Sequence, residues 1–156
     1  MGMTPSHRDT LNAINLFTEF LKHKRLKLTQ QRMDILQKLL SIQEHVNAEE
    51  LFYQVRKDNP SIGYSTVYRT LKLLSECGIV KENHFGDRIT RYESSFNKAH
   101  HDHIVCVKCN EIYEFENEEI ENLQKEVAKN LGFKMLDHKL EIYGICKQCT
   151  QTKESS

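Results

Sequence analysis

The sequence predicts an α+β protein in which an N-terminal winged helix-turn-helix domain precedes a small α/β domain. Apolar residues recur at three- and four-residue spacing through residues 11–78, and short alternating runs follow. Charge also divides the chain. Residues 1–92 hold 14 basic and 10 acidic residues, a net charge of +4, whereas residues 93–156 hold 8 and 12, a net charge of −4. The zero net charge of the whole chain therefore conceals two modules.

Four helices are expected in the first module. The first covers residues 11–21, where the apolar positions follow helical spacing. Thr29 is placed to cap the second, and a capping box at residues 47–50 opens the third. The fourth starts within residues 61–65 and ends at Gly78, a residue type that commonly terminates helices.

Two short strands are expected after the fourth helix, at residues 79–85 and 88–93, joined at Gly86 and Asp87. Three helices followed by a two-stranded hairpin make a winged helix-turn-helix, to which the first helix is an addition. In this arrangement the fourth helix is the one that recognises DNA.

The second module is expected to begin after a polar link at residues 94–99. Its pattern predicts a hairpin of residues 104–107 and 111–115, a helix over 118–131 and a strand over 133–145. These elements make a small α/β domain.

Two matched cysteine pairs, Cys106-x2-Cys109 and Cys146-x2-Cys149, are the strongest local signal. Four thiolates arranged tetrahedrally make a closed structural Zn2+ site that contributes folding energy. The alternative is one or two redox disulfides. The fifth cysteine, Cys77, lies at the apolar end of the fourth helix and is expected to be a small core residue.

The tetrapeptide His100-His101-Asp102-His103 is the second signal. On a strand, alternate side chains face opposite ways, so His101 and His103 share one face while His100 and Asp102 share the other. One segment can therefore supply two metal sites. Imidazole with carboxylate suits Fe2+, Mn2+, Zn2+ or Ni2+. His45 and His138 stand alone in the sequence and carry no local signal.

The fourth helix is the third signal. It carries hydroxyl groups and a guanidinium, which suit phosphates and base edges, while other side chains of the helix face the core. The candidate DNA-contacting residues on it are Tyr64, Ser65, Thr66, Tyr68, Arg69 and Thr70.

Taken together, these segments resemble the ferric uptake regulator superfamily of bacterial metal-dependent repressors. The matching segments are LKLTQQR at 26–32, YSTVYRTL at 64–71, RYE at 91–93, HHDHIVCVKC at 100–109, and the cysteines at 146 and 149. They occur in the order that the family shows, from about residue 11 to residue 149.

The resemblance implies a homodimer, with a tetramer as an alternative, that binds double-stranded operator DNA. It implies a DNA-binding domain over residues 1–93, a hinge over 94–99 and a metal-binding dimerisation domain over 100–156. Lys27 resembles a minor-groove contact of the family, and Tyr64 and Arg69 resemble its major-groove contacts.

The resemblance also assigns three metal sites. It implies structural Zn2+ at the four cysteines Cys106, Cys109, Cys146 and Cys149. It implies a regulatory site formed by His45, Glu93, His101, His103 and Glu114. It implies an additional site formed by His100, Asp102, Glu121 and His138.

The expected function is a repressor of iron-uptake genes that binds DNA when loaded with Fe2+, for which Mn2+ or Zn2+ can substitute. Peroxide-sensing relatives typically carry Asp at the positions of Glu93 and Glu114 and often Asn at that of Arg69, and zinc-sensing relatives usually lack this ligand arrangement. Iron sensing is therefore favoured over these two alternatives.

Two alternatives come from other functional classes. A zinc-dependent hydrolase needs an open metal position and a substrate pocket, and a thiol redox protein needs reversible disulfides. We expect no enzymatic activity, because no pattern resembles a nucleophile–base pair or a phosphate-binding loop. We also expect a cytoplasmic protein without a membrane partner. No apolar run reaches the roughly 18–20 residues that span a bilayer, and the N-terminus lacks a signal-peptide pattern.

Overall fold

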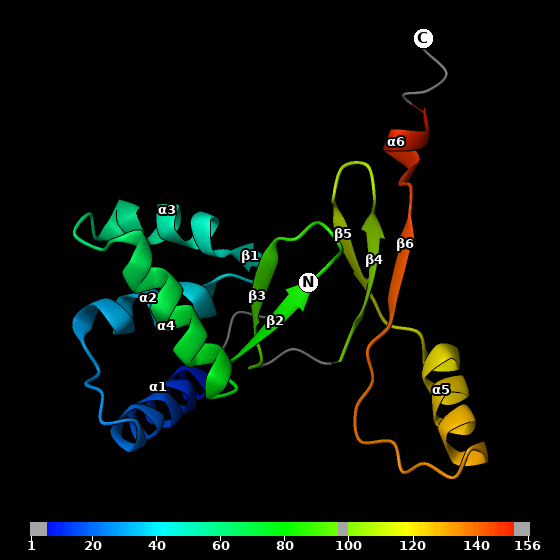
Figure 1. Ribbon diagram of the computed structural model, residues 1–156, viewed down its shortest axis with the longest axis horizontal. Coiled ribbons are helices and arrows are strands. Elements are labelled where there is room, and N and C mark those ends of the chain that lie inside the picture. The colour runs from blue at the N-terminus through cyan, green and yellow to red at the C-terminus, as the bar shows by residue number, and fades with distance from the viewer. Residues whose placement is uncertain (1–5, 97–99, 152–156) are drawn as a thin grey trace. The chain divides into compact units, whose positions relative to one another are not determined.

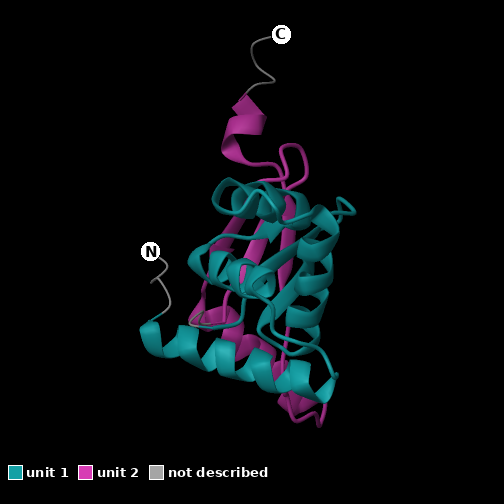
Figure 2. Ribbon diagram, turned by 90° about the vertical axis from the view of Figure 1, so that its left-hand side faces the viewer, with its two compact units in different colours: residues 1–98 teal, residues 99–156 magenta. Residues whose placement is uncertain are grey.

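The chain divides into two units, residues 1–98 and 99–156, each with its own small sheet (Figure 1; Figure 2). The computed structural model describes residues 6–96 and 100–151. Of the expected hinge at 94–99, residues 97–99 lie outside the described residues. None of the described helices is long and apolar enough to cross a bilayer.

Unit 1 is a winged helix-turn-helix preceded by one further helix. Its helices are α1 (His7–His23), α2 (Gln30–Ser41), α3 (Ala48–Asp58) and α4 (Tyr64–Glu76). Its strands are β1 (Val46–Asn47), β2 (Val80–His84) and β3 (Thr90–Ser94). The sheet has the order β1-β3-β2, with both pairs antiparallel, so the wing hairpin β2–β3 gains a short third strand.

Side-chain caps and an apolar core explain where these helices form. The Thr29 hydroxyl accepts a hydrogen bond from the backbone N–H of Arg32, and Asn47 forms a reciprocal capping box with Glu50. The core cluster buries one apolar face of each helix, and these fully buried side chains include Phe17, Leu36, Leu51 and Leu71. The helix starts expected at Thr29 and Asn47 are confirmed.

Helix α1 begins earlier and ends later than its apolar periodicity predicts. A capping box between Ser6 and Asp9 starts the helix, although residues 7–10 are polar. Apolar spacing cannot detect a polar first turn. Strand β1 was also not expected, because its two residues are too short for a recognisable alternation.

Unit 2 contains one three-stranded sheet and two helices. Its elements are β4 (Asp102–Cys106), β5 (Ile112–Phe115), α5 (Glu118–Asn130), β6 (Glu141–Gly144) and α6 (Lys147–Gln151). The sheet order is β5-β4-β6, with β4 antiparallel to β5 and parallel to β6. The hairpin and the helix are confirmed, whereas α6 was not expected.

The strand expected over residues 133–145 is wrong in its first part. Within this described stretch only residues 141–144 form a strand, because β6 pairs with a β4 that is itself only five residues long. The apolar alternation before residue 141 has no partner strand to stabilise it. His138, which was expected on the strand, therefore lies in the segment before it.

Unit 2 buries few apolar side chains. Among its described residues only Val105 and Cys106 are buried apolar residues, and α5 has no buried residue. Instead, large apolar side chains on and after α5 are exposed: Leu123, Val127, Leu131, Phe133 and Leu136. The apolar stripe of α5 thus faces outward in the single chain.

Candidate metal centres and nucleic-acid interface

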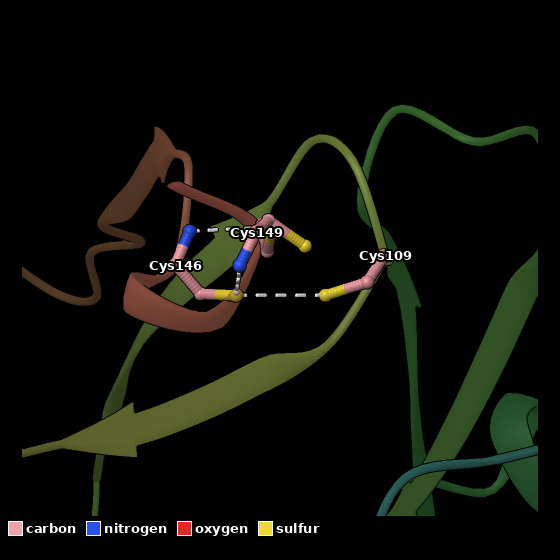
Figure 3. A group of neighbouring side chains, drawn as sticks. Cys109, Cys146 and Cys149 are labelled. Atoms are coloured by element: carbon pink, nitrogen blue, oxygen red, sulfur yellow. Dashed lines mark hydrogen bonds between the residues drawn. The ribbon is translucent and has the colours of Figure 1, made fainter. Parts of the chain in front are cut away.

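The four cysteines meet because β4 and β6 are parallel neighbours. Cys106 ends β4 opposite Gly144 of β6, so the carboxyl ends of both strands lie at one edge of the sheet. Cys109 follows in the β4–β5 turn, and Cys146 and Cys149 follow β6, as Figure 3 shows for three of the four. All four Sγ atoms lie within 4.8 Å of one another.

Backbone N–H groups point at these sulfur atoms. The N–H of Cys146 donates to Cys106 Sγ at 3.3 Å and, with that of Cys109, lowers the pKa of Cys106 to about 6. The neighbouring thiols Cys146 and Cys109 raise the pKa of Cys149 to about 12. Cys106 is thus readily ionised, whereas its sulfur neighbours disfavour the ionised form of Cys149. A bound cation would compensate the charge of several thiolates. This donor set fits Zn2+.

A second donor set lies on the opposite side of β4 from His103. His138 Nε2 is 2.9 Å from Glu121 Oε1 of α5, and His100 Nε2 is 3.5 Å from the same oxygen. Asp102 completes the set, with its Oδ1 atom 3.3 Å from His100 Nε2. All four ligand atoms lie within 4.8 Å of one another.

Asp102 shows that this set fits a cation. Its side chain is 2% exposed, yet within the described residues its Oδ1 atom accepts no well-aligned hydrogen bond. A buried carboxylate oxygen without such a bond is costly, and a bound divalent ion would satisfy it. Imidazole and carboxylate ligands suit several divalent transition metals.

Unit 1 holds a buried histidine–carboxylate pair. His45, just before β1, has its Nε2 atom 3.2 Å from Glu93 Oε2 of β3, and their side chains are 7% and 5% exposed. The rings of His45 and Phe85 pack in a T-shaped arrangement with their centroids 5.4 Å apart. Both residues therefore have defined positions within unit 1.

Unit 2 holds the other three residues assigned to the regulatory site. His101 Nε2 is 3.6 Å from Glu114 Oε1, and the rings of His101 and His103 have centroids 5.0 Å apart. Glu114 is the β5 partner of His103 in the antiparallel register. Alternate side chains of residues 100–103 therefore belong to different donor sets, as expected for a strand: His101 and His103 to the regulatory set, and His100 and Asp102 to the set with Glu121 and His138.

Two neighbouring polar residues were missed by the sequence analysis. Glu141 of β6 is the register partner of His103 on the side away from Glu114, so the three residues form a row across the sheet. Asn83 of β2 is buried and donates from Nδ2 to Glu93 Oε1 at 3.2 Å. Neither lies in a motif, and only strand pairing brings them to the ligands.

The exposed side of α4 carries most of the candidate DNA contacts. Tyr64, Ser65, Tyr68 and Arg69 are exposed, and Thr66 is half-buried. Arg69 Nε donates to the Ser65 carbonyl at 3.2 Å, which holds the guanidinium along the helix. Lys27, in the loop before α2, is exposed as well.

Thr70 is the exception on this helix. Its side chain is buried and its hydroxyl donates to the Thr66 carbonyl at 2.7 Å. The expectation that Thr70 presents a hydroxyl to DNA is therefore wrong. Spacings of three and four residues place it on the same side of the helix as the buried Val67 and Leu74.

Comparison with known proteins gives consistent matches along most of the chain. The model of the "Ferric uptake regulator family" matches residues 23–143. The "Ferric uptake regulation protein" of Campylobacter jejuni is 40% identical over 139 residues, covering 88% of each chain.

Two solved structures are similar in fold and sequence. A Helicobacter pylori ferric uptake regulator, described as having three functional metal binding sites, aligns with a TM-score of 0.85 at 29% identity, covering 96% of this chain and 97% of that one. The Vibrio cholerae regulator, described as showing a structural rearrangement of its DNA-binding domains, aligns with a TM-score of 0.71 at 38% identity, covering 83% and 98%.

Proposed function

Because the chain belongs to the ferric uptake regulator family, we propose that it is a metal-responsive, DNA-binding transcriptional repressor. In this proposal it senses Fe2+ in the cytoplasm, represses iron-uptake genes when metal-loaded and has no enzymatic activity. The observation that carries the proposal is the division of ligands around β4. Thiolates gather at one end of the strand, and two thiolate-free histidine–carboxylate groups lie on its two faces.

The four cysteines would hold a structural Zn2+. A closed four-thiolate site exchanges its metal slowly and offers no open position for a substrate, so it suits a structural role. The site also lies within unit 2, which buries few apolar side chains among its described residues. We assign folding of unit 2, and not sensing, to this site.

His45 and Glu93 of unit 1 and His101, His103 and Glu114 of unit 2 would together hold the regulatory ion. Five ligands drawn from both units would couple the orientation of the DNA-binding unit to metal occupancy. A metal shifts such an equilibrium only by its higher affinity for one arrangement. The rearranged DNA-binding domains of the Vibrio cholerae relative support this kind of mechanism.

The set of His100, Asp102, Glu121 and His138 would hold a third ion. The Helicobacter pylori relative has three functional metal binding sites, which supports assigning three donor sets here. Unit 2 carries an acidic surplus, and Asp102 and Glu121 are part of it, so bound cations would offset some of that charge.

Iron is favoured over other metals by the ligand types and by the relatives. The carboxylates at Glu93 and Glu114 with three imidazoles suit Fe2+, and the Campylobacter jejuni relative is a ferric uptake regulation protein. Zn2+ binds many such sites more tightly than Fe2+, so a titration must use buffered metal concentrations.

A homodimer would place two recognition helices on one operator. The exposed apolar stripe of α5, with Leu123 59% and Val127 57% exposed, is a surface that a second copy of unit 2 can cover. Two-fold symmetry of the protein would then match a palindromic operator, with α4 and its Arg69 facing the major groove.

The deciding experiment is a DNA-binding titration. Fluorescence anisotropy of a palindromic, A·T-rich operator is measured with buffered Fe2+, Mn2+ and Zn2+, against a scrambled duplex. We expect Fe2+ or Mn2+ to increase specific affinity in the wild-type protein and in His84→Ala, a control at an exposed histidine. His101→Ala should lose this increase while keeping its structural zinc.

Each other outcome has a defined meaning. Specific binding that no metal increases would exclude the regulator proposal. A response to Zn2+ at low free concentration without a response to Fe2+ would assign zinc sensing, and loss of DNA binding on mild peroxide treatment of the iron form would assign peroxide sensing. Operator binding by His101→Ala that equals the wild type would refute the regulatory ligand set.

A further inference from the structure

Asn83 is a polar residue on the buried side of the wing hairpin. It lies on β2 opposite Arg91 of β3, and its side chain is almost fully buried at 7% exposure. The same face carries Glu93, two residues along β3, as a diagonal neighbour within reach of a long side chain. A buried amide is destabilising unless its polar atoms are hydrogen-bonded, so its partner indicates its role.

That partner is a proposed regulatory ligand. Asn83 Nδ2 donates to Glu93 Oε1 at 3.2 Å, while the other oxygen, Oε2, lies 3.2 Å from His45 Nε2. An ionised carboxylate only accepts hydrogen bonds, so the amide must present its NH2 group to Glu93. The two oxygens are thereby distinguished, and Oε2 is directed at His45.

We infer that Asn83 is a positioning residue that holds the Glu93 carboxylate oriented for the regulatory metal. The inference rests on the proposed function. An amide suits this task because it donates a hydrogen bond to a carboxylate without neutralising its charge. A leucine, which has the same branched outline but no polar atoms, would leave Oε1 without this donor, and a carboxylate would repel Glu93.

The expected effect is on metal affinity. Partners that orient a ligand typically contribute about 10- to 100-fold to metal affinity. Because Asn83 is neutral and contacts one oxygen of one ligand, we expect the lower end, about a 10-fold weaker affinity on removal of the amide. The four-cysteine zinc site lies in unit 2 and should be unaffected.

The test measures Mn2+ affinity by calorimetry in zinc-loaded protein. All variants carry His138→Ala, which removes a ligand of the third set and leaves the regulatory set as the non-cysteine site. Asn83→Leu should weaken Mn2+ binding by about 10-fold, and Asn83→Ala, which adds no bulk, should weaken it in the same direction. The matched control is His84→Leu, at the next residue, whose side chain is exposed on the other face of the strand.

A double-mutant cycle separates positioning from a general structural effect. In a Glu93→Ala background, Asn83→Leu should change Mn2+ affinity by less than about 2-fold, because the residue acts through Glu93. Equal affinity of Asn83→Leu and its parent would overturn the inference, as would an equal loss with and without Glu93. If the His138→Ala parent binds no Mn2+, the proposed regulatory site itself fails, which is a distinguishable result.

Discussion

Replacing Cys146 by serine removes one of four clustered sulfur atoms and should unfold unit 2 selectively. Its Sγ atom lies 3.8 Å from Cys109 Sγ, so it links the segment after β6 to the β4–β5 turn. Serine is a poor Zn2+ ligand at neutral pH, and the closed site would lose its metal. The natural control is Cys77→Ser, since Cys77 lies at the end of α4 in unit 1.

The magnitude follows from how little else stabilises unit 2. Burial of a side chain such as Val105 contributes only about 1.5–3 kcal/mol, and few described apolar residues of this unit are buried. Structural zinc in small domains contributes about 10–16 kcal/mol. Loss of about 3 kcal/mol, only a fraction of that, would raise amide exchange rates by about 100-fold.

Hydrogen exchange followed by mass spectrometry measures this effect segment by segment. In Cys146→Ser we expect β4, β6 and α6 to lose protection while α2 to α4 keep theirs, and metal analysis should show loss of zinc. Cys77→Ser should keep both its zinc and its protection in unit 2. A zinc-free Cys146→Ser protein with wild-type protection in β4 and β6 would refute the reasoning.

Three further predictions concern a helix cap, an ion pair and the third metal set. Asn47→Ala removes the α3 capping box and should lower the free energy of unfolding by about 1 kcal/mol in a denaturant titration. Arg91 holds the pKa of Asp87 below its ordinary value. Asp87→Asn should therefore cost about 1 kcal/mol of stability at pH 7, a difference that disappears as the pH falls below the lowered pKa; an equal cost in acid would contradict it. His138→Ala should bind one divalent ion fewer by metal analysis while retaining zinc, and an unchanged metal count would exclude His138 as a ligand.

Local patterns predicted most of the helices and their caps. Thr29 and Asn47 could be recognised because a cap depends on residues three positions apart, and the cysteine pairs because their spacing is local as well. The resemblance to a known family supplied His45 as a candidate ligand, which its neighbours in sequence do not suggest. The two errors share a cause. Thr70 was assigned to the DNA-facing side and residues 133–140 to a strand from local pattern alone, whereas burial decides the first and the presence of a partner strand decides the second.

The sequence by itself determined the two modules, the capped starts of α2 and α3, and the residue types capable of binding metal. Only the tertiary structure decided which of them meet. The parallel pairing of β4 with β6 brings the two cysteine pairs to one edge, and the same pairing sets Glu141 beside His103. The wing hairpin likewise brings Asn83 to Glu93. Such contacts depend on the register between strands, and register is set by packing across the whole unit and leaves no mark in the spacing of residues along the chain.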